Sequence, residues 1–126
     1  MGGELLFSKD IVYYICDKVL KDTTLDVFYI ISQHDGISKI DVLRTYQERL
    51  GIDPSTKKFR YTIDEAIATL LGTTFVDFYK DGTSDKYFLT IHGELAAQLM
   101  GELIKEKPDL LKASKVLASE LKEGAN

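Results

Sequence analysis

The sequence predicts a mainly α-helical domain that carries one small β-hairpin. Apolar residues recur at helical spacing in six separate segments of the chain. Two aromatic-rich segments, residues 74–79 and 86–91, flank a polar connection that contains Gly82, as the strands of a hairpin do. The chain has 126 residues, of which 44% are hydrophobic, and this is enough to bury one core. We therefore expect a single domain over residues 1–126.

The first two predicted helices precede residue 37. Residues 9–21 carry one apolar stripe and follow Ser8, which is a suitable N-cap. Thr23, with Asp26 three residues later, can cap a second helix. That helix ends near Gly36, which suits the left-handed conformation of a helix C-cap.

A third and a fourth helix follow, with a turn between them. Ser38 begins a capping box for the third helix, and Gly51 ends that helix. Residues 52–58 predict a turn, in which Asp53 can cap the fourth helix. The start of the fourth helix stays open, because Thr62 also begins a capping box.

The hairpin and two further helices complete the chain. Residues 80–85 connect the two predicted strands, and Thr90 can cap a helix whose apolar stripe covers residues 94–106. Pro108 predicts a kink or break, since the residue before a proline avoids the helical conformation. A last helix is predicted over residues 109–122.

The composition narrows the class of protein. The formal net charge is −4, and Cys16 is the only cysteine, which excludes a disulfide within the chain and a cysteine-rich zinc site. No apolar run reaches the length that crosses a bilayer, and the N-terminus lacks the basic and apolar regions of a secretory signal. We expect a cytoplasmic protein that does not associate with membranes.

No pattern indicates catalysis or a cofactor. The chain has no P-loop, no Gly-rich dinucleotide turn, no G-x-S-x-G and no H-E-x-x-H. His34 and His92 lie at predicted element boundaries, without the helical spacing that would assemble a metal site. Cys16 lies beside an apolar stripe, where a buried structural thiol is the usual outcome. We expect no enzymatic activity, no cofactor and no metal.

The charge is unevenly distributed. Residues 37–62 hold six basic and three acidic residues, whereas the whole chain is acidic. A basic segment on an acidic body is compatible with one surface that faces nucleic acid, because phosphate neutralisation supplies most non-specific affinity.

A motif at the end of the predicted hairpin resembles one that is found in a known family of proteins. Residues 87–93 read Tyr-Phe-Leu-Thr-Ile-His-Gly and match Tyr-x-Leu-Thr-x-x-Gly at every fixed position. With the order of elements and the turn at residues 51–55, this makes residues 24–93 resemble the winged helix-turn-helix superfamily, in the manner of small transcription regulators of the MarR and PadR kinds. The expected fold is a winged-helix core with extra N- and C-terminal helices.

The resemblance implies a role for two elements. Residues 59–71, or 55–71 with an earlier start, would be the recognition helix that enters the major groove, and residues 74–91 would form the wing beside the backbone. Arg60, Tyr61 and Thr62 would then reach base edges, and Lys57 and Lys58 would contact phosphates. The remaining expected contacts with DNA are the basic residues Lys39, Lys80 and Lys86.

The terminal helices are the expected dimer interface. Residues 5–21 and 94–122 flank the predicted core, and in related regulators the terminal helices form a two-fold dimer. An uncovered apolar stripe usually marks an interface. Here the stripe consists of Leu110, Leu111, Leu117, Ala118 and Leu121. The alternative is that these helices fold back onto the core of their own chain.

Two functions are compatible with these features. The first is a sequence-specific, homodimeric transcription regulator that binds double-stranded DNA. The second is a winged-helix module that binds another protein, such as an anti-repressor, adaptor or assembly factor, without DNA. The acidic net charge, the acids Asp81 and Asp85 near the wing tip, and Asp64-Glu65 on the recognition helix favour the second.

Overall fold

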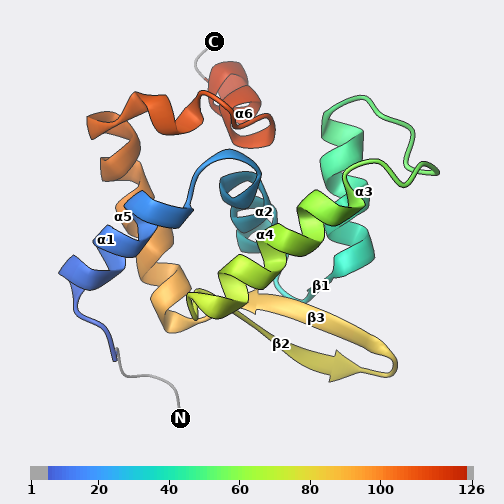
Figure 1. The fold of residues 1–126 in the computed structure, drawn as a ribbon, viewed down its shortest axis with the longest axis horizontal. Helices are drawn as coiled ribbons and strands as arrows, with labels where there is room; N and C mark the ends of the chain where they lie inside the picture. The colour runs from blue at the N-terminus through green and yellow to red at the C-terminus, as the bar shows by residue number, and fades with distance from the viewer. Residues whose placement is uncertain (1–5, 125–126) are drawn as a thin grey trace.

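The computed structural model describes residues 6–124, with side chains to residue 121. Its order of elements confirms a mainly α-helical fold with a small sheet (Figure 1). The elements are α1 (Lys9–Val19), α2 (Asp22–Gln33), β1 (Ile37–Ser38), α3 (Lys39–Arg49), α4 (Arg60–Gly72), β2 (Val76–Asp81), β3 (Ser84–Leu89), α5 (Ile91–Glu106), the 3-10 helix η1 (Pro108–Leu111) and α6 (Val116–Gly124). Leu5, the first residue of the predicted N-terminal flanking segment, lies outside the described residues.

Helix α2 occupies the centre of the molecule. It packs against α3, α4, β3 and α6, while α1 packs against α5 on one side (Figure 1). Five of its apolar residues are buried, which gives this helix the largest share of the core; they are Leu25, Val27, Phe28, Ile30 and Ile31. In the described part of the chain, no helix combines the length and the hydropathy needed to span a membrane.

The sheet has three antiparallel strands in the order β1-β3-β2. The two-residue strand β1, which the sequence did not predict, pairs Ile37 with Tyr87. The hairpin is also tighter than predicted. Asp81 pairs with Ser84, so the strands continue into the predicted connection and leave only Gly82 and Thr83 as the turn.

The motif at residues 87–93 joins the hairpin to α5. The Thr90 side chain accepts a hydrogen bond from the Gly93 amide at 3.1 Å, which confirms Thr90 as the N-cap, and its hydroxyl donates to the Thr74 carbonyl at 2.5 Å. Gly93 lies so close to the residue before β2 that a Cβ atom there would be 2.0 Å from the Phe75 carbonyl oxygen. The threonine therefore begins the helix, and the glycine lets it approach the hairpin.

The prediction of one helix over residues 109–122 is wrong. After α5, Pro108 begins the short helix η1, and α6 starts only at Val116. The reason lies in α2, because the buried Asp26 carboxylate accepts hydrogen bonds from the backbone amides of Lys115, Val116 and Leu117. The predicted capping box of Thr23 and Asp26 at the start of α2 is wrong. Helix α2 begins earlier, at Asp22, and its N-cap residue Lys21 makes no side-chain capping hydrogen bond.

This break changes the predicted apolar stripe. Leu117 is only 8% exposed, so the fold of its own chain covers it, and the expectation of an uncovered stripe is wrong at this residue. Leu110 and Leu111 lie in η1, half-buried against the core. Ala118 is half-buried as well, and Leu121 is 47% exposed.

Candidate nucleic-acid interface

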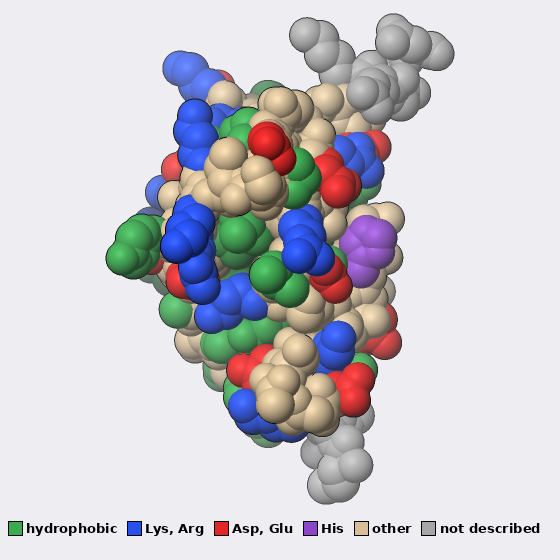
Figure 2. Space-filling view, turned by 90° about the vertical axis from the view of Figure 1, so that its right-hand side faces the viewer, with side chains coloured by type: hydrophobic (Ala, Val, Ile, Leu, Met, Phe, Trp, Pro, Cys, Tyr) green, Lys and Arg blue, Asp and Glu red, His purple; other side chains and the backbone are tan. Residues whose placement is uncertain are grey.

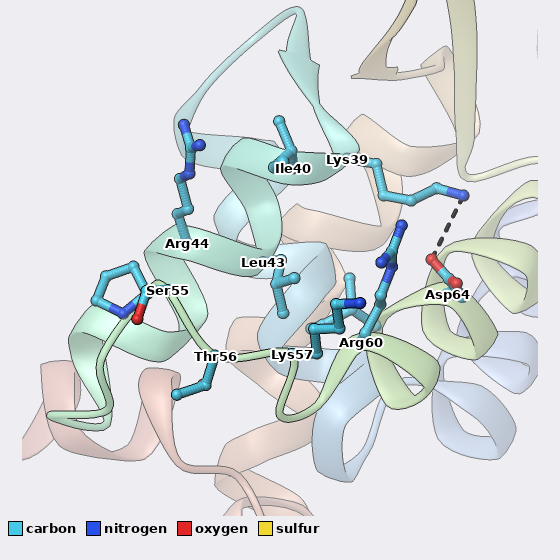
Figure 3. Close-up of a pocket in the computed structure, with 11 residues that line it drawn as sticks. Lys39, Ile40, Leu43, Arg44, Ser55, Thr56, Lys57, Arg60 and Asp64 are labelled. Carbon is cyan, nitrogen blue, oxygen red and sulfur yellow. Dashed lines mark ion pairs between the residues drawn. The ribbon is translucent and has the colours of Figure 1, made fainter.

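Three of the predicted DNA-facing residues, Lys39, Lys57 and Arg60, line one pocket, whereas Thr62 lines another, beside the end of α1. Figure 2 views the right-hand side of Figure 1 and shows Lys and Arg side chains around exposed hydrophobic ones, with acidic side chains nearby. The first pocket, of about 350 Å³, lies between α3 and the start of α4. Its apolar lining comes from Ile40, Leu43 and Ile63. Its cationic lining comes from Lys39, Arg44, Lys57 and Arg60 (Figure 3).

Helix α4, the predicted recognition helix, begins at Arg60, next to the predicted start at residue 59, and the earlier start at residue 55 that the sequence also allowed is wrong. The preceding residues form turns instead. The Asp53 side chain accepts from the Ser55 amide at 2.9 Å, and the Asp53 carbonyl accepts from the Thr56 amide at 3.1 Å. Asp53 therefore stabilises the turn and does not cap the helix.

Phe59 is the last residue before α4 and adopts a left-handed conformation, with φ of 72°. This conformation is strained for a bulky residue, so other contacts must hold it. The Phe59 ring packs edge-on against Tyr46, with the ring centroids 5.4 Å apart. Lys58 and Lys115 place their ammonium groups 5.5 and 5.1 Å from the Phe59 ring centroid.

Gln47 on α3 forms hydrogen bonds with the loop that precedes α4. Its side chain is fully buried, and its amide group donates to the carbonyls of Thr56 and Lys58 at 3.1 and 3.0 Å. Backbone carbonyls that would otherwise lack a partner are thereby satisfied. This support was missed in the sequence because a single glutamine on a helix carries no signal of its distant partners.

The first turn of α4 presents the three predicted base-reading residues to solvent. Arg60, Tyr61 and Thr62 are all exposed, and Tyr61 is 85% exposed. So large an exposed fraction is unusual for a tyrosine, and it leaves the Tyr61 ring accessible to a binding partner.

Ion pairs neutralise two of the acids on this surface. Lys39 Nζ lies 3.4 Å from Asp64 Oδ1, as Figure 3 shows, and Arg44 lies 3.8 Å from Asp41. Among residues 6–121, no ion pair involves Lys57, Lys58 or Arg60. The cations before and at the start of α4 therefore keep their charge for an external partner, whereas the charge of Lys39 is partly compensated.

The wing carries less free charge. Lys80 pairs with Asp85 across the hairpin at 3.0 Å. Lys86 is half-buried and lies opposite Tyr79 in the sheet. The predicted wing contacts therefore lie on the same hairpin, but only Lys80 projects far into solvent, with a side chain that is 68% exposed.

The remaining candidates have structural roles. His92 is buried, and its Nε2 accepts from the amides of Leu6 and Phe7 at 3.0 and 3.1 Å. Cys16 is buried, as predicted, and burial raises the pKa of its thiol to about 12. Within the described residues, no group of three His, Cys, Asp or Glu side chains is placed to hold a metal ion.

Comparisons with known proteins concern the fold. The sequence matches no protein-family model and no curated protein. The transcriptional regulator SlyA shares 16% sequence identity, with a TM-score of 0.52 over 93% of this chain and 80% of that chain. PcaV, a transcriptional regulator from Streptomyces coelicolor solved with its natural ligand, shares 17% identity, with a TM-score of 0.52 over 93% of this chain and 82% of that chain. These likenesses confirm the predicted winged-helix fold of the MarR type.

Proposed function

We propose that this chain is a transcription regulator that binds double-stranded DNA as a homodimer. One observation carries the proposal. The first turn of a helix-turn-helix recognition element presents Arg60, Tyr61 and Thr62 to solvent. Beside it are Lys57 and Lys58, which form no ion pair within the described residues. The pairing of Asp64 with Lys39 reduces the repulsion that this acid would exert on phosphate, whereas Glu65 on the same helix is exposed and forms no ion pair within residues 6–121.

In this proposal α4 enters the major groove with its N-terminal end first. Arg60 can donate two hydrogen bonds to a guanine, and Thr62 can contact a base edge or a thymine methyl group. Lys57 and Lys58 contact phosphates and fix the register. The hairpin lies beside the backbone, where Lys80 and Lys86 contribute.

The homodimer uses the terminal helices. Leu121 on α6 and the α1 residues Ile11 and Tyr14 are exposed apolar side chains, at 47%, 48% and 62%. Exposed apolar surface of this kind favours association. A two-fold dimer would read two half-sites about one helical turn apart, or a multiple of that distance.

Fluorescence anisotropy with a pool of random duplexes tests the proposal. The protein is titrated at low and moderate salt beside the triple variant Lys57→Ala, Lys58→Ala, Arg60→Ala. We expect salt-sensitive binding that the triple variant loses, with a smaller slope of log affinity against log salt by about two to three.

A second triple variant controls for net charge. Lys9→Ala, Lys105→Ala, Lys112→Ala removes the same charge from exposed positions on α1, on α5 and after η1. It should keep most of the affinity. Equal loss in both variants, or no binding by the wild type at low salt, would contradict the proposal.

The protein-binding module remains the second candidate. It is favoured by the net charge of −4 and by the ion pairs that occupy Lys39 and Lys80. In that case the exposed Tyr61 and the half-exposed Phe78 and Tyr79 would meet a partner protein. Absence of duplex binding together with a dimeric mass would support this candidate.

A further inference from the structure

The start of α6 is fixed by a carboxylate from the centre of the fold. Asp26 on α2 has no exposed surface, and it accepts from Ser114 Oγ at 2.5 Å and from the Lys115 amide at 2.8 Å. The Val116 and Leu117 amides donate to the same carboxylate at 3.2 and 3.1 Å. A buried carboxylate requires such compensation, and the first amides of a helix are well suited to supply it.

Lys115, whose amide is held in this way, also contacts the residue that precedes α4. Lys115 donates its backbone amide to Asp26, and its side chain places Nζ 5.1 Å from the centroid of the Phe59 ring. Phe59 is the left-handed residue from which α4 begins. One residue therefore connects the start of α6 to the start of α4.

Two further contacts connect the same parts of the fold. Tyr46 is buried and packs its ring against Phe59, and burial together with the charge of Asp26 raises the pKa of its phenol. Arg49, at the end of α3, forms an ion pair with Glu120 on α6. Helix α6 thus contacts α2 and α3, and Lys115, the residue just before α6, contacts Phe59.

We propose that Asp26 and Lys115 are positioning residues for the recognition helix. Docking of α6 stabilises the strained conformation of Phe59 and, through it, the loop that presents Lys57, Lys58 and Arg60. Release of α6 loosens this loop and weakens DNA binding. The part of the inference that concerns DNA rests on the proposed function.

Hydrogen exchange and DNA affinity in the full-length protein test the inference together. Lys115 is exposed, so Lys115→Gln should not unfold the chain. We expect it to speed amide exchange over residues 56–63 by about two- to fivefold and to weaken duplex binding by a similar factor, the size of one cation–π contact. Lys115→Arg should restore both, because a guanidinium group also packs on an aromatic ring.

Lys112→Gln is the matched control. It removes the same charge three residues away, and no contact between Lys112 and Phe59 is among the cation–π contacts of the described residues. It should leave exchange over residues 56–63 unchanged. Asp26→Asn should have a larger effect than Lys115→Gln, because the asparagine oxygen can replace Oδ1, which accepts from Ser114, Val116 and Leu117, while its NH2 group cannot accept from the Lys115 amide as Oδ2 does.

The outcomes separate this inference from the proposed function. Unchanged exchange in Lys115→Gln, or equal loss of affinity in Lys112→Gln, overturns the inference even if the wild type binds DNA. A wild type that binds no duplex removes the proposed function, and the exchange comparison then decides alone whether α6 positions α4. If Asp26→Asn fails to fold, the Lys115 variants decide the matter without it.

Discussion

Gly93 shows how a single residue can set the distance between two elements. Its backbone φ is not in the left-handed region, so the need for glycine here is one of space. The hypothetical Cβ would lie 2.0 Å from the Phe75 oxygen and 3.3 Å from Leu89 Cβ. Because the first of these neighbours is backbone, it cannot rotate away. The glycine of the motif therefore permits α5 to begin against the hairpin.

We predict that Gly93→Ala lowers the free energy of unfolding by about 1–3 kcal/mol or more, since overpacking at a rigid position costs that amount. Urea denaturation measures the change. Gly101→Ala is the control, because Gly101 lies in the same helix and, apart from its chain neighbours and the backbone of its own helix, no described atom lies within 4 Å of the added atom. That substitution should raise the free energy of unfolding by about 0.5–1 kcal/mol. Equal effects of the two substitutions would contradict the explanation from close contact.

Cys16 provides a second prediction at the residue scale. Burial raises the pKa of its thiol from 9.0 to about 12, so the reactive thiolate is scarce near neutral pH. We expect the native protein to react with a thiol reagent at pH 8 at least about a hundredfold more slowly than the urea-unfolded chain. Fast labelling of the native protein would show that the thiol is accessible.

The same thiol contributes to the pH dependence of stability. The unfolded chain loses its thiol proton near pH 9, whereas the folded chain keeps it to about pH 12. The contribution to stability is therefore complete below pH 9 and is lost as the pH rises from 9 to 12. Cys16→Ala should make the decline of unfolding free energy over this range shallower. Tyr13, Tyr46 and Tyr87, whose pKa values are also raised, should keep some decline.

At the scale of elements, features fixed by local contacts were predicted from the sequence, whereas features fixed by distant contacts were not. The N-caps Ser8, Ser38 and Thr90 were predicted correctly because a capping hydrogen bond joins residues three apart. The start of α6 was not, because Asp26 fixes it from another helix, and the start of α4 stayed open between residues 55, 59 and 62 because Gln47 holds the preceding loop from α3. Such partners have no regular spacing in the sequence. The short strand β1 was missed for a similar reason, since its partner is the distant Tyr87.

The wing gives a prediction at the same scale. Asp85 compensates the charge of Lys80, so Asp85→Asn should leave that cation free for phosphate. We expect affinity for duplex at low salt to rise by about two- to fivefold, with a salt slope steeper by about one. Anisotropy titrations measure both quantities.

Asp109→Asn is the control for this prediction, because it makes the same change of charge on η1, at an exposed position. It should change affinity by less than about twofold. A similar rise in both variants would mean that net charge, rather than the wing, governs binding.

At the scale of the whole molecule, the candidate site was predicted more completely than its support. Arg60, Tyr61 and Thr62 are all exposed in the first turn of α4, but they point to different sides of the helix: Arg60 lines the pocket against α3, whereas Thr62 lies beside the end of α1 and the start of α2. Their ion-paired neighbours were not predictable, since Lys39 and Asp64 come from different helices. The apolar stripe of the last helix was partly misassigned, because periodicity predicts which residues face inward without identifying what covers them.

The dimer gives the prediction at this scale. We expect light scattering to give twice the chain mass of 14.2 kDa for the wild type, and a single chain mass for Leu121→Asp. Leu121 is 47% exposed, so its replacement should leave the circular dichroism spectrum unchanged. Leu117→Asp should instead disturb the fold, because Leu117 is buried within its own chain. A Leu121→Asp variant that keeps the wild-type mass would exclude this interface.

The capping of α6 by Asp26 has a consequence for how the chain folds. A nine-residue segment is too short to be a stable helix in isolation, and here its first amides find their acceptor about ninety residues earlier in the chain. Residues 116–124 therefore become helical only after α2 has folded, because Asp26 on α2 supplies the acceptor for their first amides. The formation of this short helix thus depends on a long-range contact. Helicity in this segment would serve as a reporter of completed tertiary structure, and a peptide of these residues alone would remain a coil.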